Sequence, residues 1–354
     1  MDTTNFTEKG IEHLLSGNFK DALDLFTKDI EQNSYAKGAY LNRGNVYTGL
    51  GDYCSAINDY TKTIEIDPQD ADAYYNRGSA YLEINQYKKA LEDYSRALEL
   101  NPEMPVACYG RGNVFLKAGN YKQAIEDFQR AIELNPDFAE AYYFRGVAHM
   151  KAGNHEQAVH DFKKTMELNS SYPEAYYSRG LFYFELGNYR QALDDFNKAI
   201  ELNPCYADAY TNRGTIFAGS GDYQRAIQDY SKAIELDPDS MLTLYNRGLA
   251  FLHAGNFANA VSDFSKAIGL NHISSEIYNN RGVAYHELGC YAEAISDFCT
   301  AITLDPGNAE AYGNRGASYM MLNQYESGIE DIKTAARLKL KEAQGYLLSK
   351  GIEW

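Results

Sequence analysis

Hydrophobic and polar positions follow one 34-residue pattern along almost the whole chain. In residues 71–104, the run ADAYYNRGSAYLEI has the apolar spacing of a helix, NQY interrupts it, and KKALEDYSRALEL has it again. Asn101-Pro102 then ends the second run, because a proline disfavours the helical conformation in the residue before it. Each unit is therefore predicted to be a helix, a short turn, a second helix and another short turn.

The dipeptide Arg-Gly marks the period. It occurs nine times without insertion or deletion, at 43-44, 77-78, 111-112, 145-146, 179-180, 213-214, 247-248, 281-282 and 315-316. A fixed period of this length is the signature of a solenoid, in which each unit buries its apolar face on its neighbours. The pattern predicts ten units, at 3–36, 37–70, 71–104, 105–138, 139–172, 173–206, 207–240, 241–274, 275–308 and 309–342. Residues 343–354 carry Tyr346 in the register of the first helix, and we predict that they form a helix that caps the last apolar face.

Small residues predict where the two helices of a unit come close. Glycine stands in the middle of each first helix, as Gly78 does, although it costs about 1 kcal/mol relative to alanine there. A small residue, here Ala90, follows twelve positions later on the second helix. We therefore expect the two helices to touch at these positions. The turn between them carries glycine in most units and Asn85 in this one, which predicts a left-handed residue.

The spacing of these residues resembles the tetratricopeptide repeat (TPR) family over residues 3–342. The motif in one unit is an aromatic, a glycine, a tyrosine, an alanine, a second aromatic, a second alanine and a proline, namely Tyr74, Gly78, Tyr81, Ala90, Tyr94, Ala97 and Pro102. The resemblance implies an all-α fold, a right-handed α-solenoid known as the TPR superhelix. It also implies that the first helices line a concave groove that binds a peptide segment or a partner helix without catalysis.

An aspartate follows each Arg-Gly arginine sixteen residues later, on the second helix of the same unit. Examples are Arg77 with Asp93, Arg145 with Asp161, and Arg213 with Asp229. The first unit has Lys9 and Leu25 at these two positions, and the joint absence indicates that the pair acts within one unit. We interpret the pairs as a ladder of structural ion pairs. The alternative is a row of arginines that binds phosphate or carboxylate, but helical-wheel geometry turns the arginines away from the groove.

A helical wheel places a different set of side chains on the other face of the first helix, and the resemblance to TPR proteins implies that this face lines the groove. In the middle units and in the eighth unit this set is apolar or aromatic: Tyr75, Tyr109, Tyr143, Phe144, Tyr177, Leu181, Phe184 and Tyr245. Apolar patches of this kind mark binding surfaces, and an aromatic anchor contributes about 2 kcal/mol or more. We therefore predict a peptide-binding surface, with packing of the rings along neighbouring first helices as the alternative.

Asparagines form the second candidate set, two residues before the glycine. They are Asn42, Asn76, Asn212, Asn246, Asn280 and Asn314. An amide offers two donors and an acceptor, so a row of amides can hold a peptide backbone without reading its sequence. The row is similar to the asparagine ladder in the TPR superhelix of O-linked N-acetylglucosamine transferase, whose catalytic region has no counterpart here. The alternative is that the amides bond to the backbone of the next unit.

Charge narrows the class of partner. The chain has 49 acidic residues against 33 lysines and arginines, a formal charge of -16. With no basic stripe, we expect neither nucleic acid nor an anionic membrane as a partner. The groove positions include acidic residues such as Glu140 and Glu174 and few cations. We therefore expect a neutral to basic protein or peptide, and we do not expect an acidic chaperone tail.

Motifs for chemistry are missing from the sequence. The five cysteines form no CxxC pair, and His155 and His160 are five residues apart, which puts them on different faces of a helix. We expect no metal, no cofactor and no enzyme activity. With no signal-peptide core and no apolar run that could span a bilayer, we expect a cytoplasmic protein. Two alternatives remain: a self-assembling homo-oligomer, through the repeat ends or the convex face, and the recruiting arm of a transferase whose catalytic part is on another chain.

Overall fold

The computed structural model describes residues 6–270 and 274–354. Residues 3–5 of the first predicted repeat and residues 271–273 of the eighth lie outside the described part. Contacts divide the chain into two compact units, residues 1–178 and 179–354, and each unit is described by itself.

The described residues form helices joined by short turns, and they include no strand. We call the odd-numbered helices up to α19 the A helices and the even-numbered ones the B helices. The bounds are α1 Phe6–Leu15, α2 Phe19–Gln32, α3 Lys37–Gly49, α4 Tyr53–Ile66, α5 Ala71–Glu83, α6 Tyr87–Leu100, α7 Pro105–Lys117, α8 Tyr121–Leu134, α9 Ala139–Lys151, α10 His155–Leu168, α11 Pro173–Glu185, α12 Tyr189–Leu202, α13 Ala207–Gly219, α14 Tyr223–Leu236, α15 Met241–His253, α16 Phe257–Gly269, α17 Ser275–Glu287, α18 Tyr291–Leu304, α19 Ala309–Met321, α20 Tyr325–Arg337 and α21 Lys341–Ser349.

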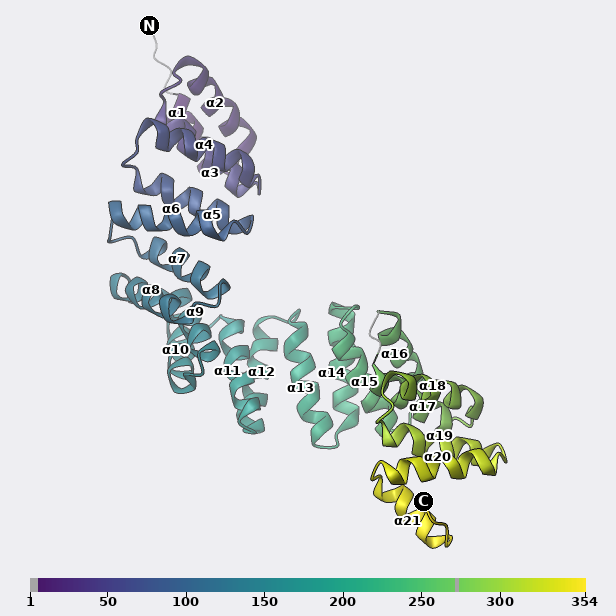
Figure 1. The fold of residues 1–354 in the computed structure, drawn as a ribbon. Helices are drawn as coiled ribbons and strands as arrows, with labels where there is room; N and C mark the ends of the chain where they lie inside the picture. Colours follow the sequence, from purple (N-terminus) through teal and green to yellow (C-terminus); the bar gives the residue numbers. More distant parts are fainter. Residues whose placement is uncertain (1–5, 271–273) are drawn as a thin grey trace. The chain divides into compact units, whose positions relative to one another are not determined.

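Helices that follow one another in sequence pack side by side within each unit (Figure 1). In the first unit α5 contacts α6, and α6 contacts α7; in the second unit α15, α16 and α17 do the same. Within the first unit each A helix from α1 to α9 also contacts the next A helix, and within the second unit each A helix from α13 to α19 does so. The A helices therefore form a continuous layer in each stack, and the predicted all-α solenoid of helix pairs is confirmed.

The repeat at α5 and α6 shows how the local sequence sets the helix ends. The Asp70 side chain accepts a hydrogen bond from the Ala73 amide at 3.0 Å and so caps the start of α5. Asn85, in the turn before α6, has φ 59°, and Gly51 has φ 78° at the equivalent place. The predicted left-handed turn residue is confirmed at both. At the end of α6, the Asn101 side chain accepts from the Glu103 amide at 3.1 Å.

The glycine in the middle of the A helices up to α17 makes room for a ring of the following B helix. A Cβ added to Gly44 would lie 2.6 Å from the Tyr60 ring, closer than real contacts allow. Tyr60 is 1% exposed, and its hydroxyl is within hydrogen-bond distance of Thr48 and Asn45. We expected the glycine to let the two helices touch at their small residues; in this repeat the close partner is the aromatic ring.

Helix α21 covers the apolar end of the last repeat. Leu347 and Ala343 are buried against Ile332 and Ala336 of α20. The helix begins two residues before the segment predicted to be the cap and ends at Ser349, and residues 350–354 follow without helical structure. Over the described part of the chain, the longest apolar helical stretch falls short of what a membrane span requires.

Candidate binding surface

Each Arg-Gly arginine lies in a two-pronged ion pair with the aspartate of its own repeat. Arg77 donates through Nε and Nη2 to the two oxygens of Asp93, both at 2.8 Å. The equivalent bonds join Arg145 to Asp161 and Arg213 to Asp229 at 2.6–2.8 Å. The aspartates are buried, and the arginine side chains are mostly covered. The side chains that form the proposed ladder are therefore brought together.

The same arginines reach a third helix, which the sequence reasoning missed. Nη1 of Arg247 donates to Ser231 Oγ, on the B helix of the preceding repeat, at 3.1 Å. Arg77 contacts Thr61 in the same way at 3.1 Å. The signal is a hydroxyl or amide residue sixteen positions before the arginine, and its oxygen accepts from the guanidinium: Thr27, Thr61, Gln129, Asn197, Ser231 and Ser265. Each such guanidinium connects one A helix to two B helices.

The tyrosines of the first unit pack against core rings. Tyr109 lies 5.9 Å from Phe128, a buried ring of α8, and 5.7 Å from Phe144, centroid to centroid. Tyr143 lies 5.0 Å from Phe144 and 5.9 Å from the buried Phe162 of α10. Burial raises the pKa of the Tyr109 and Tyr143 hydroxyls above the usual range. These side chains are half-buried, and part of their area stabilises the stack.

The other predicted aromatic and apolar residues are also half-buried: Tyr75, Tyr177, Leu181, Phe184 and Tyr245. Tyr75 lies 6.0 Å from the Tyr94 ring, and Tyr245 lies 6.0 Å from the Phe264 ring. Phe184 contacts Tyr189 at 5.8 Å, and both line a cavity of ≈ 540 Å³ in the second unit. The alternative weighed from the sequence was packing of the rings along neighbouring A helices. The contact of Tyr109 with Phe144 is of that kind, whereas the contacts in this paragraph are with rings of B helices.

The predicted asparagines form hydrogen bonds within the protein, but rarely the ones expected. Asn42 and Asn212 donate to the carbonyl four residues earlier in their own helix, each at 2.9 Å. Asn76 donates to Asn45 Oδ1 at 3.3 Å, and Asn314 to Asn279 Oδ1 at 3.1 Å.

Asn280 donates to the Tyr245 hydroxyl at 3.1 Å, and Asn246 is half-buried on the same helix face as Tyr245. The Tyr245 hydroxyl in turn donates to Glu276. The partners are thus the helix's own backbone or side chains of the preceding A helix, not the backbone of the next unit. These bonds orient the amides along the A-helix layer.

Carboxylates line the outer edge of the same layer. Asp72, Glu140, Glu174, Asp208, Glu276 and Glu310 are all exposed, six residues before the mid-helix glycines. Within each unit, the positions that a helical wheel places on one side of the A helices therefore combine half-buried rings, internally held amides and exposed carboxylates. We call this side the A-helix face.

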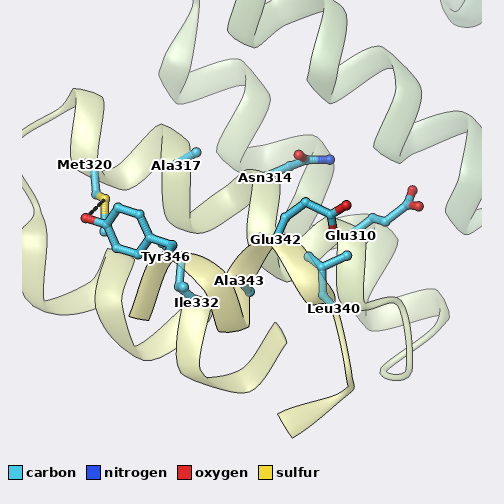
Figure 2. A pocket seen from close by; sticks show the side chains of 10 residues that line it. Glu310, Asn314, Ala317, Met320, Ile332, Leu340, Glu342, Ala343 and Tyr346 are labelled. Carbon is cyan, nitrogen blue, oxygen red and sulfur yellow. Dashed lines mark hydrogen bonds between the residues drawn. The ribbon is translucent and has the colours of Figure 1, made fainter. Parts of the chain in front are cut away.

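A cavity opens on this face at the end of the second unit, where α19, α20 and α21 meet (Figure 2). Its volume is ≈ 460 Å³. Its lining consists of Glu310, Gly313, Asn314, Ala317, Met320, Ile332, Leu340, Glu342, Ala343 and Tyr346. The Tyr346 hydroxyl donates to the Met320 sulfur at 3.7 Å, which ties α21 to α19. This cavity contains a residue of the predicted asparagine row, Asn314, beside two carboxylates.

The chain was compared with known proteins. Models described as tetratricopeptide repeat or TPR repeat match residues 44–85, 71–104, 112–153, 139–172, 173–204, 207–240, 243–271 and 275–308. No curated protein sequence matches the chain.

Among solved structures, a tetratricopeptide repeat protein from Parabacteroides merdae is 22% identical with a TM-score of 0.53, covering 70% of this chain and 98% of that one. PilF of Pseudomonas aeruginosa is 17% identical with a TM-score of 0.52, and the match covers 58% of this chain and 94% of PilF. YrrB, described as a TPR protein with an unusual peptide-binding site, is 31% identical with a TM-score of 0.43, covering 52% and 95%. The matched models span most of the chain, and it belongs to the tetratricopeptide repeat family.

Proposed function

We propose that this chain is a non-catalytic scaffold that holds a peptide segment or partner helix of neutral to basic character on its A-helix face. Membership of the TPR family supports a protein-interaction scaffold. Binding of a neutral to basic segment on the A-helix face is supported by the exposed carboxylates beside half-buried aromatic rings on that face. A basic segment would gain charge attraction along the carboxylates while its apolar side chains cover ring area.

The arginines do not compete for this role. Their guanidinium groups are bonded to buried aspartates, and hydrogen bonding to Asp297 is the main cause that raises the pKa of Arg281. A guanidinium held in this way has its donors directed into the protein. An anionic peptide would therefore meet exposed carboxylates on the A-helix face, and the Arg-Gly arginines would not offset them.

Charge reversal tests the proposal. Peptides of twelve residues are selected from a random display library on the purified chain, and their dissociation constants are measured by fluorescence polarisation. Glu140→Lys with Glu174→Lys removes two attractions and adds two repulsions, and each exposed contact contributes roughly 0.5–1 kcal/mol, so we expect binding about tenfold weaker or more.

The matched control is Glu92→Lys with Glu126→Lys, which makes the same change in net charge on exposed positions of B helices. We expect the dissociation constant of the control to stay within about twofold of the wild type. Equal weakening in both variants would reject the A-helix face as the binding surface.

The alternatives give different results in the same preparation. Self-assembly through repeat ends or the convex face would appear in sedimentation velocity as a mass that rises with concentration. A recruiting arm of a transferase would bind a catalytic chain and leave the peptide experiment unchanged, so it is compatible with the proposal.

A further inference from the structure

The cavity at α19, α20 and α21 is lined by a glycine at a position where several other repeats carry a tyrosine ring. Three residues before the mid-helix glycine, five repeats carry tyrosine: Tyr75, Tyr109, Tyr143, Tyr177 and Tyr245. The last repeat has Gly313 at this position. A Cβ added there would lie 2.9 Å from the tip of Leu340, so Leu340 leans over the place from which a tyrosine side chain would extend.

The cavity has an apolar end and an acidic end. Met320 and Tyr346 lie toward the later turns of α19 and α21, whereas Glu310 and Glu342 lie in their first turns. Figure 2 shows the two carboxylates at one side of the cavity and the Met320–Tyr346 pair at the other. The ten lining residues include no lysine or arginine. Asn314, whose amide donates to Asn279, also lines the cavity.

We propose that this cavity binds a segment of a partner protein in which a large apolar side chain stands next to a lysine or arginine. The inference rests on the proposed function and adds a position and a sequence preference to it. The volume of ≈ 460 Å³ lies in the range of ligand sites and accommodates one aromatic or long aliphatic side chain. That side chain takes the place that a tyrosine ring occupies in other repeats.

The neighbouring cation of the partner lies against Glu310 and Glu342. Both carboxylates are exposed before binding, and an apolar group bound in the cavity would shield them from part of the solvent. A partner with an acidic residue at that position would bring a third negative charge to the same place. The cavity therefore discriminates by charge, whereas the apolar end supplies contact area.

Methionine methyl resonances provide a reporter inside the cavity. The chain has seven methionines, and Met320 lines the cavity whereas Met104 and Met166 are buried in the first unit. The full chain is labelled with ¹³C at the methionine methyl groups, and Met320→Leu assigns the signal. The probe is the hexapeptide Gly-Ser-Phe-Arg-Ser-Gly, acetylated and amidated at its ends.

We expect the probe to shift the Met320 resonance in a saturable manner and to leave the Met104 and Met166 resonances unchanged. Replacing Phe by Ala or Arg by Glu in the probe should weaken its binding at least tenfold. Glu310→Gln with Glu342→Gln should remove the preference for Arg over Glu and leave the Phe-dependent shift. An unmoved Met320 signal, or an equal response to the Arg and Glu probes, overturns the inference.

Gly313→Tyr is a second variant that restores the residue found in five other repeats. We expect it to abolish the probe-dependent shift of Met320. If Gly313→Tyr fails to fold, the variant Glu310→Gln with Glu342→Gln still tests the proposal, because Glu310 and Glu342 are exposed and their replacement leaves the packing unchanged.

The two proposals fail separately. Display-selected peptides that bind the wild type but leave Met320 unmoved would retain the proposed function and reject the cavity as their site. A Met320 response to the probe, together with peptide affinities insensitive to Glu140→Lys with Glu174→Lys, would retain the cavity and reject binding along the whole A-helix face.

Discussion

The ion pair between Arg247 and Asp263 should be strongly coupled. Arg247 donates through Nε and Nη2 to Asp263, both at 2.7 Å, and through Nη1 to Ser231 at 3.1 Å. The Asp263 side chain is 3% exposed and the Arg247 side chain 16% exposed. The perturbation is Arg247→Met, Asp263→Leu and the two together, which replace each charge with an apolar side chain that can fill similar space.

The magnitude follows from what each single substitution leaves behind. Asp263→Leu leaves a covered guanidinium without its carboxylate, and Arg247→Met leaves a buried carboxylate without its cation. Removing one partner of such a pair costs about 3–5 kcal/mol, whereas replacing both by apolar residues is often close to neutral. Even if the double variant costs as much as one single, the coupling free energy is about 3 kcal/mol.

The assay must read local stability, because long repeat arrays depart from two-state unfolding. Native-state hydrogen exchange with mass spectrometry gives opening free energies for peptides from α15 and α16. The control is the exposed pair Lys232–Glu235 on α14, 2.9 Å apart, for which we expect no measurable coupling. A coupling at the buried pair no larger than at this control would refute the argument that the ladder stabilises the stack.

Three further outcomes follow from the packing. Gly44→Ala should destabilise the second repeat by about 1–3 kcal/mol, because the new methyl group meets the Tyr60 ring at 2.6 Å. Gly49→Ala, with nothing within 4 Å, should stabilise it by up to about 1 kcal/mol, and hydrogen exchange of peptides from α3 and α4 measures both. Burial raises the pKa of Tyr60 to about 12 from an unfolded value near 10. The stabilisation of the folded state by the neutral hydroxyl is therefore complete below pH 10 and falls by about 3 kcal/mol as the pH rises toward 12. Tyr60→Phe should make the free energy of unfolding less dependent on pH in this range. Ser231→Ala removes the acceptor on α14 for the Arg247 guanidinium, and it should lower the opening free energy of α15, measured by hydrogen exchange, by about 1 kcal/mol. In an Arg247→Met background, Ser231→Ala should have no such effect.

The period of the sequence was sufficient to predict the helix pairs and the turn residues. Apolar spacing alone places α5 and α6, and the glycine or asparagine between helices marks a left-handed residue because few side chains tolerate that conformation. Prediction succeeded here because the cause is local: the residues that decide the conformation lie within a few positions of one another.

Side-chain partners were harder to predict. A wheel turns Tyr109 toward the groove but cannot show that its ring also lies against Phe128. Likewise, the amide of Asn76 reaches Asn45, 31 residues earlier, and not the next unit. Such contacts depend on how far one A helix lies from the next, which apolar spacing does not encode. The hydrogen bond from Arg247 to Ser231 has a sequence signal, namely a spacing of sixteen residues. The signal could be recognised only by comparing each arginine with the B helix of the preceding repeat.

In a repeat protein, an unusual residue at a repeated position changes the local packing, because the neighbouring units contact the side chain at that position. Gly313 illustrates this: it stands where five other repeats carry a tyrosine, and it lines the cavity of ≈ 460 Å³ at the end of the second unit. Recognition then requires only a partner that supplies the missing group, and the charges at the cavity edge decide which partner that is. We therefore expect specificity in this chain to reside at such departures, while the ion pairs and mid-helix glycines maintain the frame around them.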